Sequence, residues 1–590
     1  MKARKIRNGA ARRPALSSIG SAVAMVLIAT GAHAAETAVS GAFAPSVTGT
    51  STSVNPQTNL GAVDASISSA TVGVTTTGTA GTPPTSSYTN GNAISAKATG
   101  NIEVRTIAPT PGSPPTPVSS AATLALSQNS GVISSSVTNS SMGNYSTTIQ
   151  AGSVAAADNT ISATTTLNSG SSLVLGTAAA SGTALAGSSV LRYPVGAPQV
   201  FDAKGNIVVT TFQSATGASS SAESQGNRVD LWLLPSSGAI AAGASLERNS
   251  IAAVLKGNSA TNTAAIVSGG APSFAGSAVV SNLQVNNNAA PGAVTHSATN
   301  NNSAIDAVVS GVPLGGTNTL QSALAVRGNN ISSAATGNEA LSGTAGTAGN
   351  FILVDGVSVA GIGTPATALN NSTHNGVGVN TNVNADLAIV NSQGNIGVGI
   401  TSSTTNALVG ATVQSIASGG SVDLRANAVT AAATGNAASS AISSTDGLSA
   451  FKGTSALSNQ QANYQSPITA QMTASNIGVL TGCGGTTNNA VVSVAGNSSA
   501  ATATGNQISQ SLAIDAGGMT LGSASAVLTG GTANDGRVSA GGAATITNLQ
   551  GNYGSPVAAT NDGSQVFVGA NLVASPIAGS TFAVTGNTQQ

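Results

Sequence analysis

The sequence is poor in charged and in aromatic side chains. Charged residues make up 6% of the 590 residues and aromatic residues 2%, whereas about a quarter of an ordinary soluble domain is charged. Low charge argues against a disordered chain expanded by repulsion, and a positive mean hydropathy argues against a fully solvated one. Large apolar side chains are too sparse for a wide core. The composition therefore favours a thin core of Ala, Val, Ile and Thr, as in β-solenoids, whose stacked rungs share one narrow core.

Cysteine and histidine are also rare. Cys483 is the sole cysteine, so an intramolecular disulfide is excluded, and a small buried residue is favoured over a reactive or intermolecular thiol. Beyond residue 34 the histidines are His296 and His374, both in polar, loop-like contexts without metal-ligand spacing. These residues predict no metal site.

The first 34 residues have the order of a secretory signal peptide. A segment with six of the seventeen basic residues precedes an apolar stretch from Ala15 to Gly31, and Ala32-His33-Ala34 follows as a cleavage signature. The alternative is a retained N-terminal anchor, although the apolar run is short for a membrane span. Removing residues 1–34 leaves 11 basic and 17 acidic residues, a net charge of 11 − 17 = −6. We therefore expect an exported chain without a transmembrane segment or a nucleic-acid surface.

A ten-residue unit recurs six times. It runs from Asn to Asn, as in NAISAKATGN from Asn92, with near-copies from Asn159, Asn249, Asn329, Asn427 and Asn497. At period two, one face carries small apolar residues such as Ile94, Ala96 and Ala98, which is typical of a half-buried strand. We expect the closing Gly-Asn to form the turn, because both residues tolerate positive φ.

A second motif, Asn-x-Gln-x-Asn, alternates with the first. It begins at Asn55, Asn282, Asn391, Asn459 and Asn548. Its three amides share one face of a strand, so stacked copies can form hydrogen-bonded ladders that fix the register. The alternative is that these amides merely decorate loops.

The combined unit spans roughly seventy to a hundred residues, which we take as too long for one solenoid rung. It predicts either several rungs with loops of variable length or a stack of small β-sandwich modules. The predicted fold class is all-β, with an elongated β-solenoid or stacked β-repeat architecture after a cleaved signal peptide.

Two regions interrupt the repeats. Five prolines within 107–118 predict a linker or edge loop. Trp232, the only tryptophan, lies in 192–248 with Tyr193, Phe201 and Phe212, which suggests an aromatic-containing β insert or an ordinary local core. Within it, QVFDAKGNIVVTTF predicts a hairpin around Lys204-Gly205-Asn206, and NRVDLWLLP predicts a strand. The remaining β-repeat regions are 35–106, 119–191 and 249–590.

Motifs that carry chemistry are missing from the sequence. It contains no nucleophile elbow, P-loop, dinucleotide fingerprint or calcium-binding nonapeptide. Acids such as Asp202, Asp230 and Asp355 are scattered singly, although the fold could bring some together as a carboxylate pair. We predict no catalytic, cofactor-binding or metal residues, no cofactor, and a protein that is not an enzyme.

An exported chain in which Ala-Thr-Gly-Asn units alternate with Asn-x-Gln-x-Asn resembles β-repeat surface proteins of Gram-negative bacteria. It is similar in texture to holdfast-anchor proteins and, more distantly, to curli-type subunits, although the curli Gln-x-Gly-x-x-Asn spacing is not held. The resemblance implies a cell-surface or extracellular protein, or a periplasmic one, secreted by the general route. It would mediate attachment or form part of a fibre or biofilm matrix, with exopolysaccharide, envelope proteins or itself as partner. The alternative is a β-helical protein that binds or degrades polysaccharide.

Overall fold

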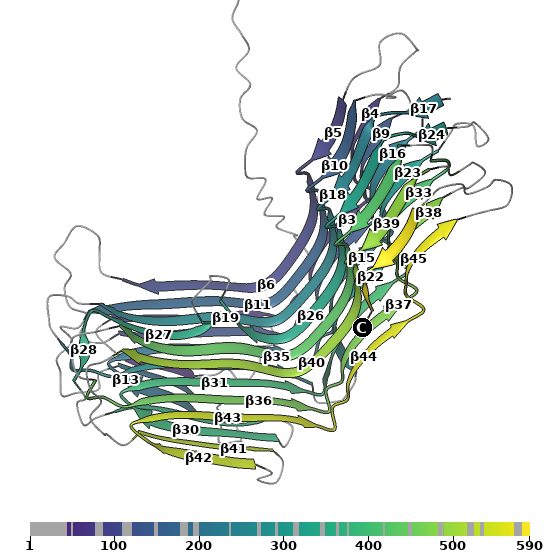
Figure 1. Ribbon diagram of the computed structural model, residues 1–590. Coiled ribbons are helices and arrows are strands. Elements are labelled where there is room, and N and C mark those ends of the chain that lie inside the picture. Colours follow the sequence, from purple (N-terminus) through teal and green to yellow (C-terminus); the bar gives the residue numbers. More distant parts are fainter. Residues whose placement is uncertain are drawn as a thin grey trace, which may run out of the picture. The chain divides into compact units, whose positions relative to one another are not determined.

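The computed structural model describes an all-β chain (Figure 1). The described residues are 44–48, 51–76, 86–108, 121–146, 152–177, 187–192, 200–234, 238–267, 273–288, 293–310, 318–342, 348–360, 365–374, 377–416, 419–445, 451–481, 487, 489–515, 524–531, 536–570 and 581–589. Within these ranges every regular element is a strand and none is a helix. The predicted signal peptide, residues 109–118 of the predicted Pro-rich segment and Cys483 lie outside the described residues.

Four parallel sheets contain one strand from each of seven successive rungs. Sheet B consists of β2 (Ser51–Asn59), β7 (Ala121–Asn129), β14 (Ile207–Thr216), β21 (Ala278–Asn287), β31 (Leu387–Ile396), β36 (Ser455–Tyr464) and β43 (Ala544–Tyr553). Sheet C consists of β3 (Val63–Ser68), β8 (Ile133–Thr138), β15 (Ser220–Gln225), β22 (Val294–Asn301), β32 (Val398–Thr405), β37 (Ile468–Thr473) and β44 (Val557–Asp562).

Sheets D and E follow along each rung. Sheet D consists of β4 (Thr71–Thr76), β9 (Ser141–Ser146), β16 (Arg228–Leu233), β23 (Ala304–Val309), β33 (Leu408–Val413), β38 (Asn476–Thr481) and β45 (Gln565–Ala570). Sheet E consists of β5 (Ser86–Asn90), β10 (Ser153–Ala157), β18 (Gly243–Glu247), β25 (Ala323–Arg327), β34 (Ser421–Arg425), β39 (Val491–Ala495) and β46 (Thr581–Thr585).

Sheet F closes each rung with the longest strands, which lie side by side in chain order in Figure 1. It consists of β6 (Ala93–Ile107), β11 (Thr160–Thr177), β19 (Ser250–Val267), β26 (Asn330–Ala340), β27 (Asn350–Asp355), β35 (Ala428–Thr445), β40 (Ser498–Asp515) and β47 (Thr588–Gln589). In the fourth rung β26 and β27 together take the place of one long strand, because both pair with β19 and β35.

Sheet A is the one antiparallel sheet of this size in the described residues, and it is built from a strand before the first rung and from segments inserted between later rungs. Its strands are β1 (Ala44–Thr48), β12 (Gly187–Arg192), β13 (Val200–Gly205), β29 (Ala366–His374), β30 (Val377–Ala385), β41 (Ala524–Gly531) and β42 (Gly536–Gly542). Two short parallel pairs complete the described strands: β17 (Gly238–Ile240) with β24 (Asn318–Leu320), and β20 (Ser273–Phe274) with β28 (Ser358–Val359).

The combined repeat unit is a single rung, which corrects the expectation that it was too long for one. The first residue of sheet B is Ser51, Ala121, Ile207, Ala278, Leu387, Ser455 and Ala544 in successive rungs, so the steps are 70, 86, 71, 109, 68 and 89 residues. Each rung accommodates this length because it contributes strands to five sheets. The irregular spacing arises largely because the chain enters sheet A after every second rung.

The three largest of the five apolar cores in the described residues lie between the layers. One core lies between sheets C, D and E and the first half of sheet F, and contains Ile94 and Ala96. A second lies between sheet B and the second half of sheet F. A third lies between sheets A and B, where Ala203 packs near Val208. The predicted alternation is confirmed, since Ile94, Ala96 and Ala98 are buried.

Two local predictions are corrected. The Gly-Asn that closes each ten-residue unit lies inside a long strand, such as β6, and not in a turn. The segment around Lys204-Gly205-Asn206 is not a hairpin, because β13 belongs to sheet A and β14 to sheet B. The predicted strand in NRVDLWLLP is confirmed as β16. Residues 200–247 of the predicted insert supply β13 to β18, and five of these strands continue sheets A to E.

Candidate functional site: amide ladders and a polar aromatic cluster

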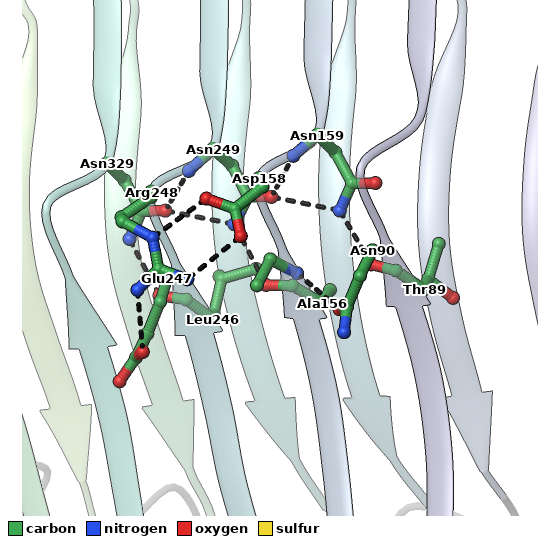
Figure 2. Close-up of polar contacts among 11 residues, drawn as sticks. Thr89, Asn90, Ala156, Asp158, Asn159, Leu246, Glu247, Arg248, Asn249 and Asn329 are labelled. Atoms are coloured by element: carbon green, nitrogen blue, oxygen red, sulfur yellow. Dashed lines mark hydrogen bonds and ion pairs between the residues drawn. The ribbon is translucent and has the colours of Figure 1, made fainter.

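A ladder of asparagines, which we call the turn ladder, runs along the corner between sheets E and F. Its members are Asn92, Asn159, Asn249, Asn329, Asn427, Asn497 and Asn587. Each donates from Nδ2 to Oδ1 of the next member at 2.9–3.0 Å. Figure 2 shows this arrangement for Asn159, Asn249 and Asn329. The amide ladders predicted from Asn-x-Gln-x-Asn are confirmed in sheet B, as between Asn391 and Asn459, whereas the turn ladder uses the Asn that opens the ten-residue unit and was not predicted.

Asn249 illustrates how completely one ladder amide is bonded. Its Nδ2 donates to Oδ1 of Asn329 and to the carbonyl oxygen of Ala156. Its Oδ1 accepts from the backbone nitrogen and from Nδ2 of Asn159. Both side-chain hydrogens and both lone pairs are therefore used, which is what a buried amide requires.

A second set of ladders lies between sheets B and F. The Asn of Ala-Thr-Gly-Asn forms a column in sheet F, in which Asn338 donates to Asn436 at 2.8 Å. The last Asn of Asn-x-Gln-x-Asn forms a column in sheet B, in which Asn395 donates to Asn463 at 2.8 Å. The two columns are joined across the layers, for example from Asn338 to Asn395 at 3.2 Å. The two sequence motifs thus meet in one network.

The glutamines of the second motif form a ladder of opposite direction. Gln393 donates to Gln284, Gln461 to Gln393 and Gln550 to Gln461 at 2.6–2.7 Å. Each donor belongs to the later rung, whereas in the asparagine ladders it belongs to the earlier rung. The other Nε2 hydrogen reaches sheet F, as from Gln393 to the carbonyl oxygen of Ala437.

Glycine precedes the sheet F asparagine because the neighbouring rung leaves no room for a Cβ atom. A Cβ atom on Gly337 would lie 2.5 Å from Oδ1 of Asn395 and 2.6 Å from the carbonyl oxygen of Gly435. The second rung is the exception, since Leu167 replaces this glycine. In the third rung, Ala215 stands at the sheet B position where the neighbouring rungs have asparagine, and it packs against Leu167. Two departures from the pattern therefore compensate each other.

A compact group of polar and aromatic residues lies on sheet D, and we call it the sheet D cluster. It comprises Tyr145, Arg228, Asp230, Trp232 and Asp306. Arg228 forms ion pairs with Asp230 at 3.1 Å and with Asp306 at 2.8 Å, and the Tyr145 hydroxyl donates to Asp230 at 3.0 Å. Trp232 meets Tyr145 edge-on, with ring centroids 5.4 Å apart, and Arg228 lies 5.9 Å from the Trp232 ring centroid. Four of the five, all except Asp306, border an open pocket of about 350 Å³ together with the adjoining turn.

Burial and mutual proximity alter the protonation of this cluster. Burial, and after it the nearby Asp230, raises the pKa of Asp306 to about 7 against the opposing effect of Arg228. Burial and Asp230 also raise the pKa of Tyr145. Burial lowers the pKa of Arg228, but the two carboxylates outweigh it and raise the pKa overall. The cluster therefore contains a fixed positive charge on Arg228 and a carboxyl group, that of Asp306, which titrates near neutrality.

The sequence did not reveal this pair of carboxyl groups, because the two residues are 76 positions apart. They become neighbours because β16 and β23 are consecutive strands of sheet D and Asp230 is in register with Asp306. An alignment of Arg228-Val229-Asp230 with Ala304-Ile305-Asp306 would have been the available signal. Of the other acids named from the sequence, Asp202 lies in β13 and Asp355 in β27.

The histidines differ from expectation. His296 is not in a polar loop but in β22, where it is fully buried and neither ring nitrogen has a hydrogen-bond partner. Burial lowers its pKa to about 4. His374 lies at the end of β29, opposite Val377 in β30.

Among the described residues, no group of three or more His, Cys, Asp or Glu side chains could hold a metal ion. The described part of the chain also has no helix of the length and hydrophobicity needed to cross a membrane. No family model, curated protein or solved structure matches this sequence.

Proposed function

We propose that this chain is an exported structural protein that mediates surface attachment or forms part of an extracellular fibre or matrix. The observation that carries the proposal is the turn ladder, which links every rung to the next from Asn92 to Asn587. Such a ladder resists sliding and separation of the rungs, because either would leave buried amides without partners. A protein that transmits force needs this kind of stiffness along its length.

The test compares cells that produce the chain with cells in which it is deleted. We expect loss of the chain to reduce retention of cells on a surface under flow, and expression from a plasmid to restore it. The chain should also be recovered outside the cytoplasm, beginning at Ala35. Unchanged retention together with a cytoplasmic location would reject the proposal.

A second candidate function is the binding of a polysaccharide at the sheet D cluster. Tyr145 and Trp232 offer aromatic surface beside hydrogen-bonding groups, a combination found where ligands bind in open pockets. Arg228 and Asp230 offset each other and Asp306 is largely neutral below pH 7, so an uncharged sugar suits the site better than an acidic one.

Binding to a panel of neutral and acidic polysaccharides tests this second function. We expect Trp232→Ala to weaken binding at least about tenfold, since stacking on the ring is lost. Tyr88→Ala removes an exposed aromatic residue of sheet E and is the matched control. Release of reducing ends that Asp306→Asn abolishes would indicate cleavage, with Asp306 as proton donor. Equal binding by both variants would reject the site.

A further inference from the structure

The first and last rungs leave the edges of four sheets open. In the described part of the chain, no strand pairs with the outer edge of β2, β3, β4 or β5. The same holds for β43, β44, β45 and β46 at the other end. Each open edge presents backbone N–H and C=O groups that can pair with another chain. Pro56 removes one donor from β2 and leaves the other residues of that edge available.

The side-chain ladders give these two ends opposite hydrogen-bonding character. At the last rung, Asn587 accepts from Asn497 and donates to Val494, so one Nδ2 hydrogen has no described acceptor. At the first rung, Asn92 donates to Asn159, and no described donor reaches its Oδ1. The same polarity holds in sheet B, where Asn552 is an acceptor in each of its described bonds and Asn59 donates onward.

The glutamine ladder gives the complementary arrangement in the reverse direction. Gln550 donates to Gln461, and no described donor reaches its Oε1. Gln57 donates one Nε2 hydrogen to the carbonyl oxygen of Ile102 and has a second hydrogen available. In the fourth to seventh rungs that second hydrogen goes to the glutamine of the preceding rung, as from Gln393 to Gln284.

We propose that a second copy of this chain binds head-to-tail, its first rung stacked on the last rung of its neighbour. Continuing the internal register places β2 of one copy on β43 of the other. The free hydrogens of Asn552 and Asn587 then donate to Asn59 and Asn92 of the neighbouring copy, and Gln57 of that copy donates to Gln550. Each contact repeats one that already joins two rungs within the chain.

The other stacking orders do not satisfy these groups. If two first rungs stacked on each other, the acceptor oxygen of Asn92 in one copy would face the same oxygen in the other. If two last rungs stacked, the Nδ2 donors of Asn587 would face each other. Sheet A cannot continue across the junction in its own antiparallel pattern. It has seven strands of alternating direction, so β42 of one copy and β1 of the next would run in the same direction. In sheet F, β47 pairs only with Ser498 and Ser499. Sheets B, C, D and E therefore carry the junction.

Head-to-tail contacts produce a ring when the rotation between successive copies closes on itself, and an open fibre when it does not. Stacking along the rung axis does not close on itself, so we expect an open fibre. The inference deepens the fibre-forming part of the proposed function and does not rest on attachment. A chain that polymerises without promoting attachment would reject the proposed attachment role alone. A chain that promotes attachment as a monomer would reject the head-to-tail contact alone.

Cysteine pairs test the contact directly in the full chain with Cys483→Ser. Ser86 and Thr581 are exposed and occupy the same register position of sheet E in the first and last rungs. With a short bismaleimide, Ser86→Cys with Thr581→Cys should give covalent polymers, and either single variant should stay a monomer. Cross-linking of a single variant, or no polymer from the pair, would overturn the proposal.

Charge placed at one end provides an independent test. Asn548→Asp with Asn552→Asp keeps the described acceptor bonds within the chain but opposes oxygen to oxygen at the junction. Sedimentation should show association weakened at least about tenfold. Asn330→Asp with Thr401→Asp adds the same charge to outward positions in mid-stack, and association should stay within about twofold. Equal association of the two double variants, with melting curves like the parent chain, would contradict the contact.

Discussion

Asn338 shows what one amide contributes to the stack. It is fully buried, donates to Asn436 and Asn395, and accepts from Asn258 and Asn286. Asn338→Ala leaves several buried partners without a bond, so we expect the free energy of unfolding to fall by roughly 3 kcal/mol or more. Urea denaturation measures the loss.

Asn330 of the same strand is the matched control for that variant. It lies at an outward position of β26, and the one bond described for its side chain is a long one to Ser332. Asn330→Ala should change the free energy of unfolding by less than about 0.5 kcal/mol. Similar losses for the two variants would show that the ladder adds no stability.

His296 should make the stability depend on pH. The unfolded chain binds a proton near pH 6.5, whereas burial lowers the pKa in the folded chain to about 4. The free energy of unfolding is therefore unaffected by His296 above pH 6.5, and it falls as the pH drops toward 4, by roughly 3 kcal/mol in total. Thermal melts at pH 7.5 and pH 5 measure the effect.

His296→Ile is the corresponding control, because Ile400 and Ile468 occupy the same register position in two later rungs. The variant should remove most of the pH dependence between 6.5 and 4 and raise stability, since two unpaired ring nitrogens leave the core. An unchanged pH profile would assign the dependence to other groups.

At the scale of the element, the turn before each ladder asparagine requires positive φ. Four of the seven residues at this position are glycines, such as Gly328 with φ of 63°, whereas Ala426 has φ of 55°. Ala426→Gly should raise the free energy of unfolding by about 1 kcal/mol because it relieves this strain. Gly328→Ala should have the opposite effect of similar size, and denaturant midpoints of both variants provide the comparison.

The exception in the second rung predicts strong coupling between Leu167 and Ala215. Leu167→Gly alone leaves a cavity, and Ala215→Asn alone forces an amide against the leucine. The double variant restores the ladder pattern of the other rungs. We expect it to be more stable than the sum of the single changes by about 1–3 kcal/mol. Additive losses in the double-mutant cycle would exclude this compensation.

Strands and ladders were predictable from the sequence because both depend on residues at period two. Ile94 and Ala96 mark a buried face, and Asn391 with Gln393 and Asn395 marks a face of amides. Rung length was not predictable, because it depends on which distant strands pair. The turn assigned to Gly-Asn failed because glycine there serves close approach between rungs and not positive φ. The Asp230–Asp306 pair required knowledge of the register.

At the scale of the whole molecule, sheet A links the rungs in pairs. Each insertion between rungs adds two antiparallel strands, as β12 and β13 do, whereas each rung adds one strand to sheet B. Strands are about 4.8 Å apart in both sheets. An insertion of two strands after every second rung therefore keeps the widths of sheets A and B equal, and both sheets contain seven strands.

Deletions test this matching. Removal of residues 207–386 takes out two rungs together with β29 and β30, so five strands of sheet A face five of sheet B. Removal of residues 207–277 takes out one rung and leaves seven strands against six. We expect cooperative thermal unfolding of the first variant and a clearly lower melting temperature, or aggregation, for the second. Equal melting temperatures would show that sheet A need not match the rungs.

The pairing of rungs through sheet A sets how such a chain can change in length. A single added rung gains a place in every parallel sheet but leaves sheet A one strand short. Filling that gap with a single antiparallel strand would reverse the direction of every strand of sheet A that follows. Two added rungs with one insertion restore both. The length of such a chain can therefore change only in steps of two rungs, which correspond to about 10 Å along the stack.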